Sequence, residues 1–251
     1  MGTRIMGILN LTPDSFFSGS RATCAQQAVE RTARLLADGA DLIDIGACST
    51  RPGAERATLQ EELSRLKESL PAIRNAFPDI PLSIDTFRAE VAETCLRDWN
   101  FCMVNDISGG DPDIYRVTAM YGAEYVLTYG ESITGDAASE MVQFFHRKLK
   151  QLHKAGVTKV VLDPGFGFGK TLEQNYRIMN GLDSLKEFGI PILVGISRKS
   201  MITRTLDITA AEALNGTTVL NTYAALHGAD WLRVHDVKEA VQTVRIIEKL
   251  K

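Results

Sequence analysis

Three acidic or amide side chains stand directly after short apolar runs, where they could bind one ligand together. They are Asp85 after residues 80–84, Asn105 after 103–104, and Asp163 after 160–162. Carboxylate and carboxamide oxygens that converge in a pocket can accept hydrogen bonds from the N–H groups of an amidine-like heterocycle. A single aspartate in such a place is about as often the N-cap of a following helix. The prediction of a binding site therefore depends on the three residues together.

Two basic clusters favour an anionic ligand. Arg233 and His235 end one apolar run, and because they are two residues apart they share a face of a strand. Both would be costly to bury against helices, so a position in an open mouth, where they suit a diphosphate, is favoured. Arg198 and Lys199 follow another run and predict a phosphate site, the alternative being a solvated basic pair.

A glycine-rich segment, Asp163-Pro-Gly-Phe-Gly-Phe-Gly-Lys170, contains no known phosphate-binding motif. Only three residues separate Gly165 from Gly169, whereas a P-loop needs four, and the spacing of a dinucleotide-binding GxGxxG is also missing. Glycines here would let the backbone fold back beside Asp163 and let a flat ligand approach closely. A flexible surface turn is the alternative.

Two segments rich in Pro, Gly, Ser, Thr and Arg, residues 11–21 and 48–57, lack helical periodicity. Such loops commonly hold functional residues. Asn10, just before the first of them, offers a neutral oxygen suited to a Mg²⁺ ion that keeps most of its waters. In the second, Thr50 and Arg51 could bind an anion or only shape the turn before Pro52.

Eight apolar runs with polar carboxyl-terminal ends must position these side chains. They lie at residues 5–9, 42–45, 80–84, 103–104, 125–127, 160–162, 192–196 and 231–234. Alternation of strands with helices implies parallel strands joined by right-handed crossovers. Eight repeats in 251 residues predict a single (β/α)₈ TIM barrel, with long loops after strands one and two and active-site residues at the carboxyl ends of its strands. A doubly wound open sheet is the alternative.

Amphipathic patterns between these runs predict the helices. They lie at residues 25–39, after 58, and at 88–97, 113–121, 139–155, 172–182, 209–227 and 237–250. Thr58 and Glu61 have the spacing of a capping box, which predicts the start of the second helix.

The composition excludes several classes of protein. A net charge of −3 gives no reason to expect nucleic acid or an anionic membrane as a partner. No apolar run approaches the roughly 20 residues of a membrane span, and a secretory signal is not expected. The four cysteines lack the spacing of a zinc site, so reduced thiols in the cytoplasm are expected. Without a linker-like segment, residues 1–251 are predicted to form one domain.

Seven motifs, in this order along the chain, resemble those of the dihydropteroate synthase family. They are Ile8-Leu-Asn-Leu-Thr-Pro-Asp-Ser-Phe16, Ser49-Thr-Arg-Pro-Gly-Ala54, Ser83-Ile-Asp-Thr86, Asn105-Asp-Ile-Ser-Gly109, Asp163 to Lys170, Ser197-Arg-Lys-Ser200 and Arg233-Val-His-Asp236. Each motif alone is weakly specific, but the set covers the chain from end to end.

The resemblance implies a barrel that usually forms homodimers and joins 4-aminobenzoate to (7,8-dihydropterin-6-yl)methyl diphosphate in folate biosynthesis. It also implies that the enzyme uses Mg²⁺ as a cofactor and is a target of sulfonamides. The implied pterin-binding residues are Asp85, Asn105, Asp163 and Lys199, and the implied diphosphate-binding residues are Asn10, Arg51, Arg233 and His235. Asn10 would also bind the metal, and Phe16, Thr50, Pro52 and Ser200 would lie near 4-aminobenzoate. The implied catalytic residues are Asp85, Asp163, Lys199, Arg233 and His235.

Two departures from the family pattern leave other functions open. Thr128-Tyr129 stands where the family often has Met-His, and Ala47-Cys48 stands where it commonly has Gly-Glu. The alternatives are a catalytically altered pterin-binding paralogue and a corrinoid-type methyltransferase of the same barrel family. The methyltransferase would not need the diphosphate residues Arg51, Arg233 and His235.

Overall fold

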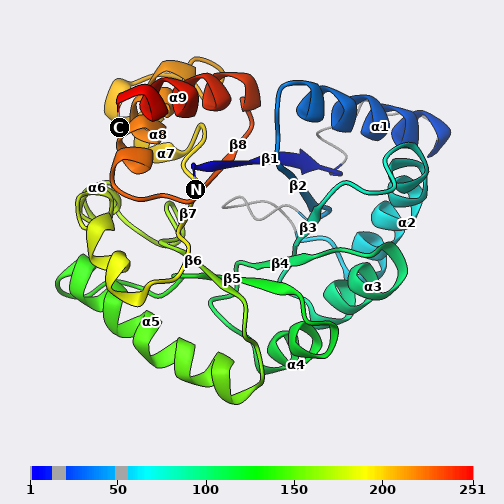
Figure 1. Cartoon of the computed structure of the whole chain (residues 1–251), viewed down its shortest axis with the longest axis horizontal. Helices are drawn as coiled ribbons and strands as arrows, with labels where there is room; N and C mark the ends of the chain where they lie inside the picture. Colours follow the sequence, from blue (N-terminus) through cyan, green and yellow to red (C-terminus); the bar gives the residue numbers. More distant parts are fainter. Residues whose placement is uncertain (1, 13–20, 49–55, 251) are drawn as a thin grey trace.

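The computed structural model describes residues 2–12, 21–48 and 56–250, which form an eight-stranded parallel barrel inside a ring of helices (Figure 1). The hydrogen-bonded strands follow the order β6-β5-β4-β3-β2-β1-β8-β7. A parallel bridge between Leu162 and Ile192 joins β6 to the segment before β7 and closes the ring. The predicted (β/α)₈ barrel is therefore confirmed, and the doubly wound open sheet is excluded.

The strands lie where the eight apolar runs predict them. They are β1 (Arg4–Asn10), β2 (Leu42–Gly46), β3 (Leu82–Asp85), β4 (Met103–Asp106), β5 (Glu124–Thr128), β6 (Val160–Asp163), β7 (Leu193–Val194) and β8 (Trp231–Val234). The third strand begins two residues later than predicted, after Pro81, because proline has no N–H to donate to a neighbouring strand.

The helices alternate with these strands. They are α1 (Arg21–Ala37), α2 (Leu59–Ala76), α3 (Ala89–Trp99), α4 (Pro112–Tyr121), α5 (Ala137–Lys154), α6 (Leu172–Asn180), the 3₁₀ helix η2 (Leu182–Phe188), α7 (Ser200–Leu206), α8 (Leu214–Leu226) and α9 (Val237–Leu250). The capping box of Thr58 and Glu61 is present at the start of α2, as predicted. No helix among the described residues is long and apolar enough to span a membrane.

Two helix predictions were wrong at their starts, and the first helix begins at Arg21, four residues before the predicted start. A single helix was expected over residues 209–227, but α8 begins at Leu214, and residues 210–213 form turns. The carbonyls of Ala210 and Ala211 accept hydrogen bonds from the Arg198 guanidinium, at 2.7 Å each. Arg198 is remote in sequence, so local periodicity could not reveal this turn.

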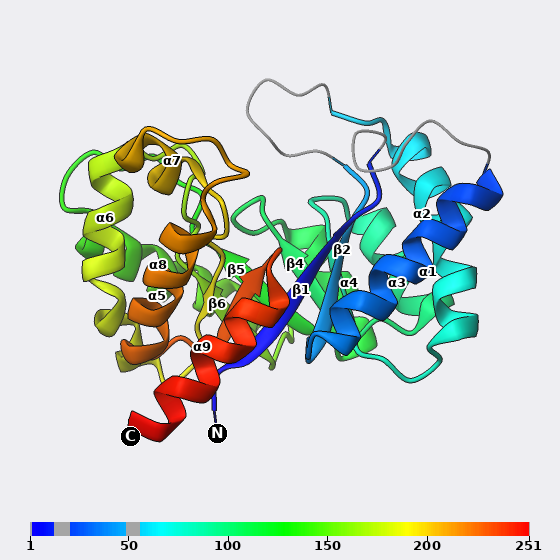
Figure 2. The same ribbon diagram turned by 90° about the horizontal axis from the view of Figure 1, so that it is seen from above.

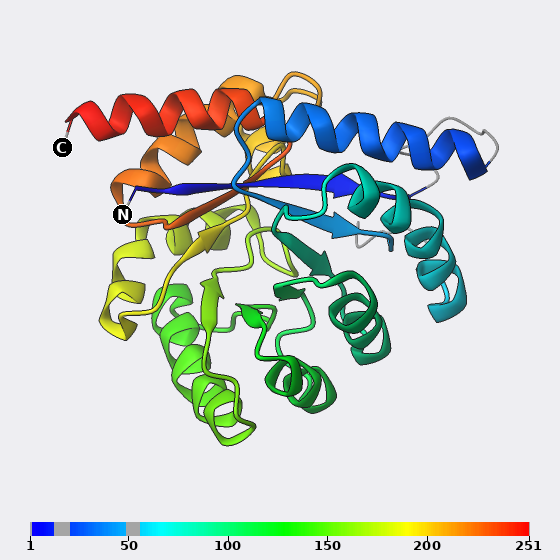
Figure 3. The same ribbon diagram turned by 45° about the vertical axis from the view of Figure 1, so that its right-hand side comes forward.

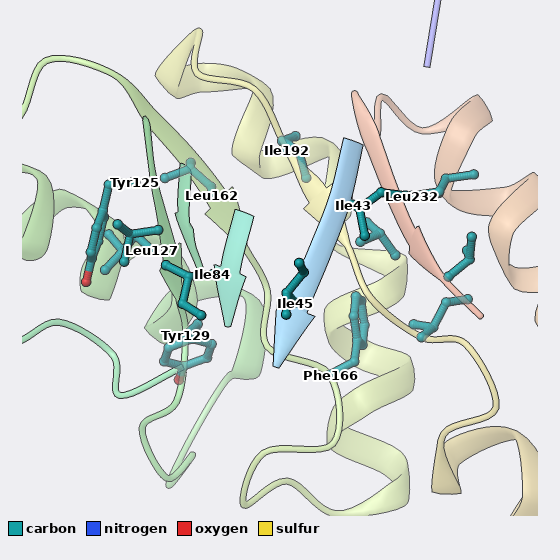
Figure 4. Close-up of a cluster of buried hydrophobic side chains, with 14 of the residues drawn as sticks. Ile43, Ile45, Ile84, Tyr125, Leu127, Tyr129, Leu162, Phe166, Ile192 and Leu232 are labelled. Atoms are coloured by element: carbon teal, nitrogen blue, oxygen red, sulfur yellow. The ribbon is translucent and has the colours of Figure 1, made fainter. Parts of the chain in front are cut away.

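Alternation of side chains along the strands gives the barrel an inner and an outer apolar core. The inner core fills the amino-terminal part of the barrel and consists of Met6, Leu42, Met103, Val126, Val161, Leu193 and Trp231. The opposite faces of the strands pack against the helices, and Figure 4 shows part of this outer core, including Ile43, Ile45, Leu127 and Leu162. Apolar side chains therefore fill the barrel at the amino-terminal ends of its strands. An opening is expected at the carboxyl-terminal ends.

Two further views show where that open end lies. Both chain termini lie at the end of the barrel opposite α7, which follows β7 (Figure 2). α1 and α9 lie along the outer side of β1 (Figure 3). The carboxyl ends of the strands therefore point to the side away from the termini.

Candidate active site

The inner face of the barrel changes from apolar to polar toward the carboxyl ends of the strands. Because side chains alternate, the next inward position lies two residues beyond each residue of the inner core. The parallel register confirms this direction, since Asp85 pairs with Asn105, and Thr128 pairs with Asp163. The inward residues at this level are Asp44, Asp85, Asn105, Thr128, Asp163 and Arg233. We call this opening the barrel mouth.

Asp44 binds two of these residues and was missing from the predicted site. Its side chain is fully buried, and Oδ2 accepts hydrogen bonds from Arg233 Nε at 2.6 Å and from Asn105 Nδ2 at 3.0 Å. A carboxylate inside the apolar run 42–45 was the available signal, because an aspartate is almost never fully buried without a partner.

Asp85 is part of the mouth and does not cap a helix. The N-cap of α3 is Arg88, whereas the Asp85 carboxylate accepts a hydrogen bond from Arg233 Nη2 at 2.5 Å. Burial raises the pKa of Asp85 to about 7, although the positive charge of Arg233 acts in the opposite direction. A carboxyl with this pKa can change its protonation state near neutral pH.

Asp163 is held by the glycine-rich segment that follows it. Gly165 N donates to Asp163 Oδ1 at 2.8 Å, and Gly165 has a positive φ of 68°. A Cβ atom at Gly165 would lie 2.1 Å from the carbonyl oxygen of Tyr129, so only glycine fits. Burial raises the pKa of Asp163, and the charge of Lys199 partly offsets this effect.

Lys170 explains the rest of the glycine-rich segment. Its ammonium group donates to the carbonyl oxygens of Tyr129, Gly165 and Phe168, at 2.5, 2.8 and 3.2 Å. Lys170 thus connects the glycine-rich segment to Tyr129, the residue after β5, through its partly buried ammonium group. The segment is an ordered support for Asp163, which disfavours the alternative of a flexible surface turn.

Lys199 and Arg198 are adjacent but have different surroundings. Lys199 Nζ donates to the carbonyl oxygen of Phe166 at 2.5 Å, and burial lowers the pKa of Lys199 to about 8. Arg198 forms two hydrogen bonds with Asp236, at 2.9 and 2.8 Å, besides those to the turn before α8. Lys199 therefore belongs to the mouth, whereas Arg198 stabilises the loop and does not supply the charge of the predicted phosphate site.

Asn10 and His235, both predicted to bind diphosphate, line the same pocket of about 360 Å³. Arg31 and Arg34 of α1 also line it. The backbone N and Nδ1 of His235 lie 3.2 and 3.1 Å from Ser197 Oγ, which connects the ends of β7 and β8. Leu35 and Asp38 line the pocket as well, so it lies between the end of β1 and α1, and its two guanidinium groups and imidazole outnumber the one carboxylate, which suits an anion.

Two glycines leave space between the polar groups. Gly46 pairs with both Asn10 and Asp85, so it faces the mouth without a side chain. At Gly195, a Cβ atom would lie 3.7 Å from Arg233 Cβ. Glycine inside a strand commonly marks a place where a ligand approaches the backbone closely.

Of the remaining predicted site residues, Ser200 lies among the described residues and four others do not. Ser200 is exposed at the first position of α7, next to Lys199. Phe16, Thr50, Arg51 and Pro52 lie outside the described residues. The two residues at the end of β5 point in opposite directions. Tyr129 points outward and packs against Phe144, with ring centroids 5.0 Å apart, whereas Thr128 points into the mouth.

Comparisons with known proteins agree on one family. A family model described as pterin binding enzyme matches residues 6–235. A dihydropteroate synthase from Synechocystis is 42% identical over 262 residues, covering 99% of this chain and 90% of the relative.

Two solved structures are similar over almost the whole chain. A dihydropteroate synthase from Clostridium difficile, determined in the presence of pteroic acid, has a TM-score of 0.95 at 37% identity, covering 99% of this chain and 97% of that one. The Yersinia pestis dihydropteroate synthase in complex with a sulfonamide drug has a TM-score of 0.91 at 36% identity, covering 99% and 94%.

Proposed function

The chain belongs to the dihydropteroate synthase family of pterin-binding enzymes, and from this premise we propose how its own residues perform the reaction. The enzyme is a transferase that joins (7,8-dihydropterin-6-yl)methyl diphosphate to 4-aminobenzoate and releases diphosphate. The observation that supports the assignment of residues best is the layer of inward polar side chains in the barrel mouth.

Asp85, Asn105, Asp163 and Lys199 bind the pterin ring. Asp85 Oδ1 and Asn105 Oδ1 are buried and have no hydrogen-bond partner among the described residues. A buried acceptor without a partner is costly, so these oxygens fit a ligand that brings N–H groups. The pterin ring carries such groups along its pyrimidine edge, and Lys199 adds a donor beside them.

Asn10, Arg51, Arg233 and His235 bind the diphosphate. Arg233 Nε donates a hydrogen bond to Asp44, and Nη2 donates one to Asp85. Arg233 Nη1 has no hydrogen bond to any described residue. A guanidinium held on one edge can present its remaining N–H groups to an anion in a fixed direction. His235 and Asn10 lie across the pocket described above, and Arg51 would act from its loop.

Mg²⁺ fits this side of the mouth. Asn10 Oδ1 lies 3.6 Å from the point that a Cβ atom on Gly46 would occupy, so the amide oxygen faces a strand position without a side chain. One neutral oxygen suits an ion that keeps several waters and binds mainly to the diphosphate. When bound, Mg²⁺ would help to neutralise the charge of the leaving diphosphate.

The bond between the pterin methylene carbon and the diphosphate oxygen breaks first. Its electron pair leaves with the diphosphate, and Arg233 and His235 stabilise the negative charge that develops. The carboxylates of Asp85 and Asp163 stabilise the positive charge left on the pterin. The amine nitrogen of 4-aminobenzoate then forms the new C–N bond with its lone pair and releases a proton. Closure of the two loops would exclude water that could capture the cation.

Phe16, Thr50, Pro52 and Ser200 bind 4-aminobenzoate. The position of Ser200, directly after Lys199 and at the exposed start of α7, supports this proposal. Sulfonamides imitate 4-aminobenzoate, so they would compete for the same place.

The enzyme works as a homodimer, and α8 supplies the shared surface. Val219 and Leu226 are 58% and 49% exposed, and because they are seven residues apart they share one face of α8. Leu206, at the end of α7, is 50% exposed. Exposed large apolar residues grouped on neighbouring helices are typical of an interface.

The protein acts in the cytoplasm on small-molecule substrates. Cys24, Cys95 and Cys102 form no disulfide with any residue that the structure describes. Free cysteines are expected where glutathione and thioredoxin keep thiols reduced.

The test is formation of 7,8-dihydropteroate by the purified protein with Mg²⁺, the pterin diphosphate and 4-aminobenzoate. We expect product, and diphosphate released in equal amount. Pterin binding without product would instead support a catalytically altered paralogue. Methyl transfer from methyltetrahydrofolate to a corrinoid would support the other member of the barrel family.

A further inference from the structure

Thr128 is a fully buried residue whose hydroxyl is left unpaired inside the barrel mouth. It ends β5, has the same inward direction as Val126 of the inner core, and pairs with Asp163 on β6. Its Oγ1 has no hydrogen-bond partner among the described residues. A buried hydroxyl that lacks a partner destabilises the ligand-free protein, so a water or a ligand is expected to fill this need.

The other buried atoms without a partner indicate whether a water or a ligand forms the missing hydrogen bond with Thr128. Of eight buried side-chain atoms without a partner in the described chain, five belong to inward residues of β2 to β5: Asp44, Ser83, Asp85, Asn105 and Thr128. Such clustering on one side of one opening indicates a shared partner that brings several polar groups. Isolated waters would not need to gather on four neighbouring strands.

The geometry of Thr128 directs its hydroxyl away from the glycine-rich segment. Its methyl carbon Cγ2 would lie 3.1 Å from a Cβ atom on Gly165, so the methyl branch faces that segment. The hydroxyl is on the other branch of Cβ, next to Asp163 on a strand about 4.8 Å away. A heterocycle that donates an N–H to Asp163 therefore presents its neighbouring groups within reach of Thr128.

We propose that the Thr128 hydroxyl forms a hydrogen bond with the 2-amino-4-oxo edge of the pterin and contributes to pterin selectivity. This inference rests on the proposed function. A hydroxyl both donates and accepts, so it can pair with either the oxo or the amino group beside the ring N–H. The methionine that often follows strand five in the family has only a weakly accepting thioether and would pack against the ring. In this chain the position adds a polar contact.

The experiment compares wild type, Thr128→Val and Thr128→Ser. Valine removes the hydroxyl and keeps the branched shape, whereas serine keeps the hydroxyl. We expect valine to weaken binding of 6-hydroxymethylpterin, measured by calorimetry, and to raise KM for the pterin diphosphate, each by about fivefold to tenfold, as for one lost hydrogen bond. Serine should stay within about threefold of wild type, and KM for 4-aminobenzoate should not change.

Thermal unfolding without ligand separates a binding role from a structural one. Because valine removes an unsatisfied hydroxyl, its Tm should equal or exceed that of wild type. Unchanged pterin affinity in Thr128→Val would overturn the proposal, and so would a lower Tm with unchanged affinity, since the hydroxyl would then serve the fold. In both cases wild-type synthase activity would still uphold the proposed function. A wild-type protein that neither binds pterin nor forms product would refute both.

Discussion

Asp44 accepts a hydrogen bond from Arg233 Nε at 2.6 Å, from a strand at the other end of the sequence. The same oxygen accepts from Asn105, so one buried carboxylate holds a residue assigned to the diphosphate and a residue assigned to the pterin. We therefore infer that Asp44 is a positioning residue, which holds Arg233 and Asn105 in place relative to each other.

We expect Asp44→Asn to lower kcat/KM for the pterin diphosphate by about tenfold to a hundredfold, as for a lost charged hydrogen bond. The asparagine keeps the shape but removes the charge that orients Arg233. Steady-state kinetics with each substrate varied in turn would measure this. Asp98→Asn is the matched control, because Asp98 lies at the surface and forms its hydrogen bonds within the described chain with its neighbour Arg97. A change of less than twofold in Asp44→Asn would show that Arg233 is positioned by Asp85 alone.

Asp163→Ala should abolish pterin binding and leave the fold intact. Burial already raises the pKa of this carboxyl, so the fold gains little from the charge that the alanine removes. The measurements are calorimetric titration with 6-hydroxymethylpterin and circular dichroism with thermal unfolding. Near-normal affinity would show that the ring does not bind at β6.

Gly165→Ala should destabilise the protein and weaken pterin binding, whereas Gly169→Ala should affect stability only mildly. Both glycines have positive φ, at 68° and 61°. A Cβ atom meets the Tyr129 carbonyl at Gly165 but no heavy atom within 4 Å at Gly169. Gly169→Ala therefore costs only the backbone term of about 1–2 kcal/mol. Urea unfolding would measure the difference, and equal losses in the two variants would contradict it.

Pterin affinity should fall as the pH drops below about 7, the pKa of Asp85 in the ligand-free protein. Protonation removes the negative charge that accepts the ring N–H groups. Titrations of 6-hydroxymethylpterin on both sides of this pH should show the loss in wild type. Asp85→Asn should bind weakly and should lose the part of this dependence that is centred near pH 7.

The Asp85 carboxyl changes the stability of the fold with pH in the opposite direction to pterin affinity. Its folded-state pKa is raised above the usual 3.8, so the folded protein binds more protons between these two values. The free energy of unfolding from this group is therefore highest at acidic pH and falls as the pH rises toward 7. Asp85→Asn should remove this slope, and an unchanged slope would assign it to another group.

Val219→Asp should convert the dimer to a monomer, because a charge would be buried in the proposed interface on α8. Analytical ultracentrifugation would detect the halved mass. Met120→Asp, at a 61% exposed position on α4, is the control and should leave the mass unchanged. A wild-type protein that sediments as a monomer would refute the proposal directly.

Local patterns in the sequence determined the barrel. Strand ends such as Asp85 and Asp163, and the capping box at Thr58, depend on residues a few positions apart, so their periodicity and spacing are visible in the chain itself. The motifs gave the family for the same reason. Long-range contacts were not visible, which is why the start of α8, fixed by Arg198, was predicted wrongly.

Only the tertiary structure decided which polar residues meet. The register of β1 against β2, and of β1 against β8, brings Asp44 and Arg233 into contact across 189 positions of sequence. It also turns Thr128 into the mouth and Tyr129 away from it. A shift of one residue in register would reverse these directions, and nothing local in the chain records how separate strands align. The sequence by itself therefore determined the kinds of groups at the strand ends, and the closed barrel determined their partners.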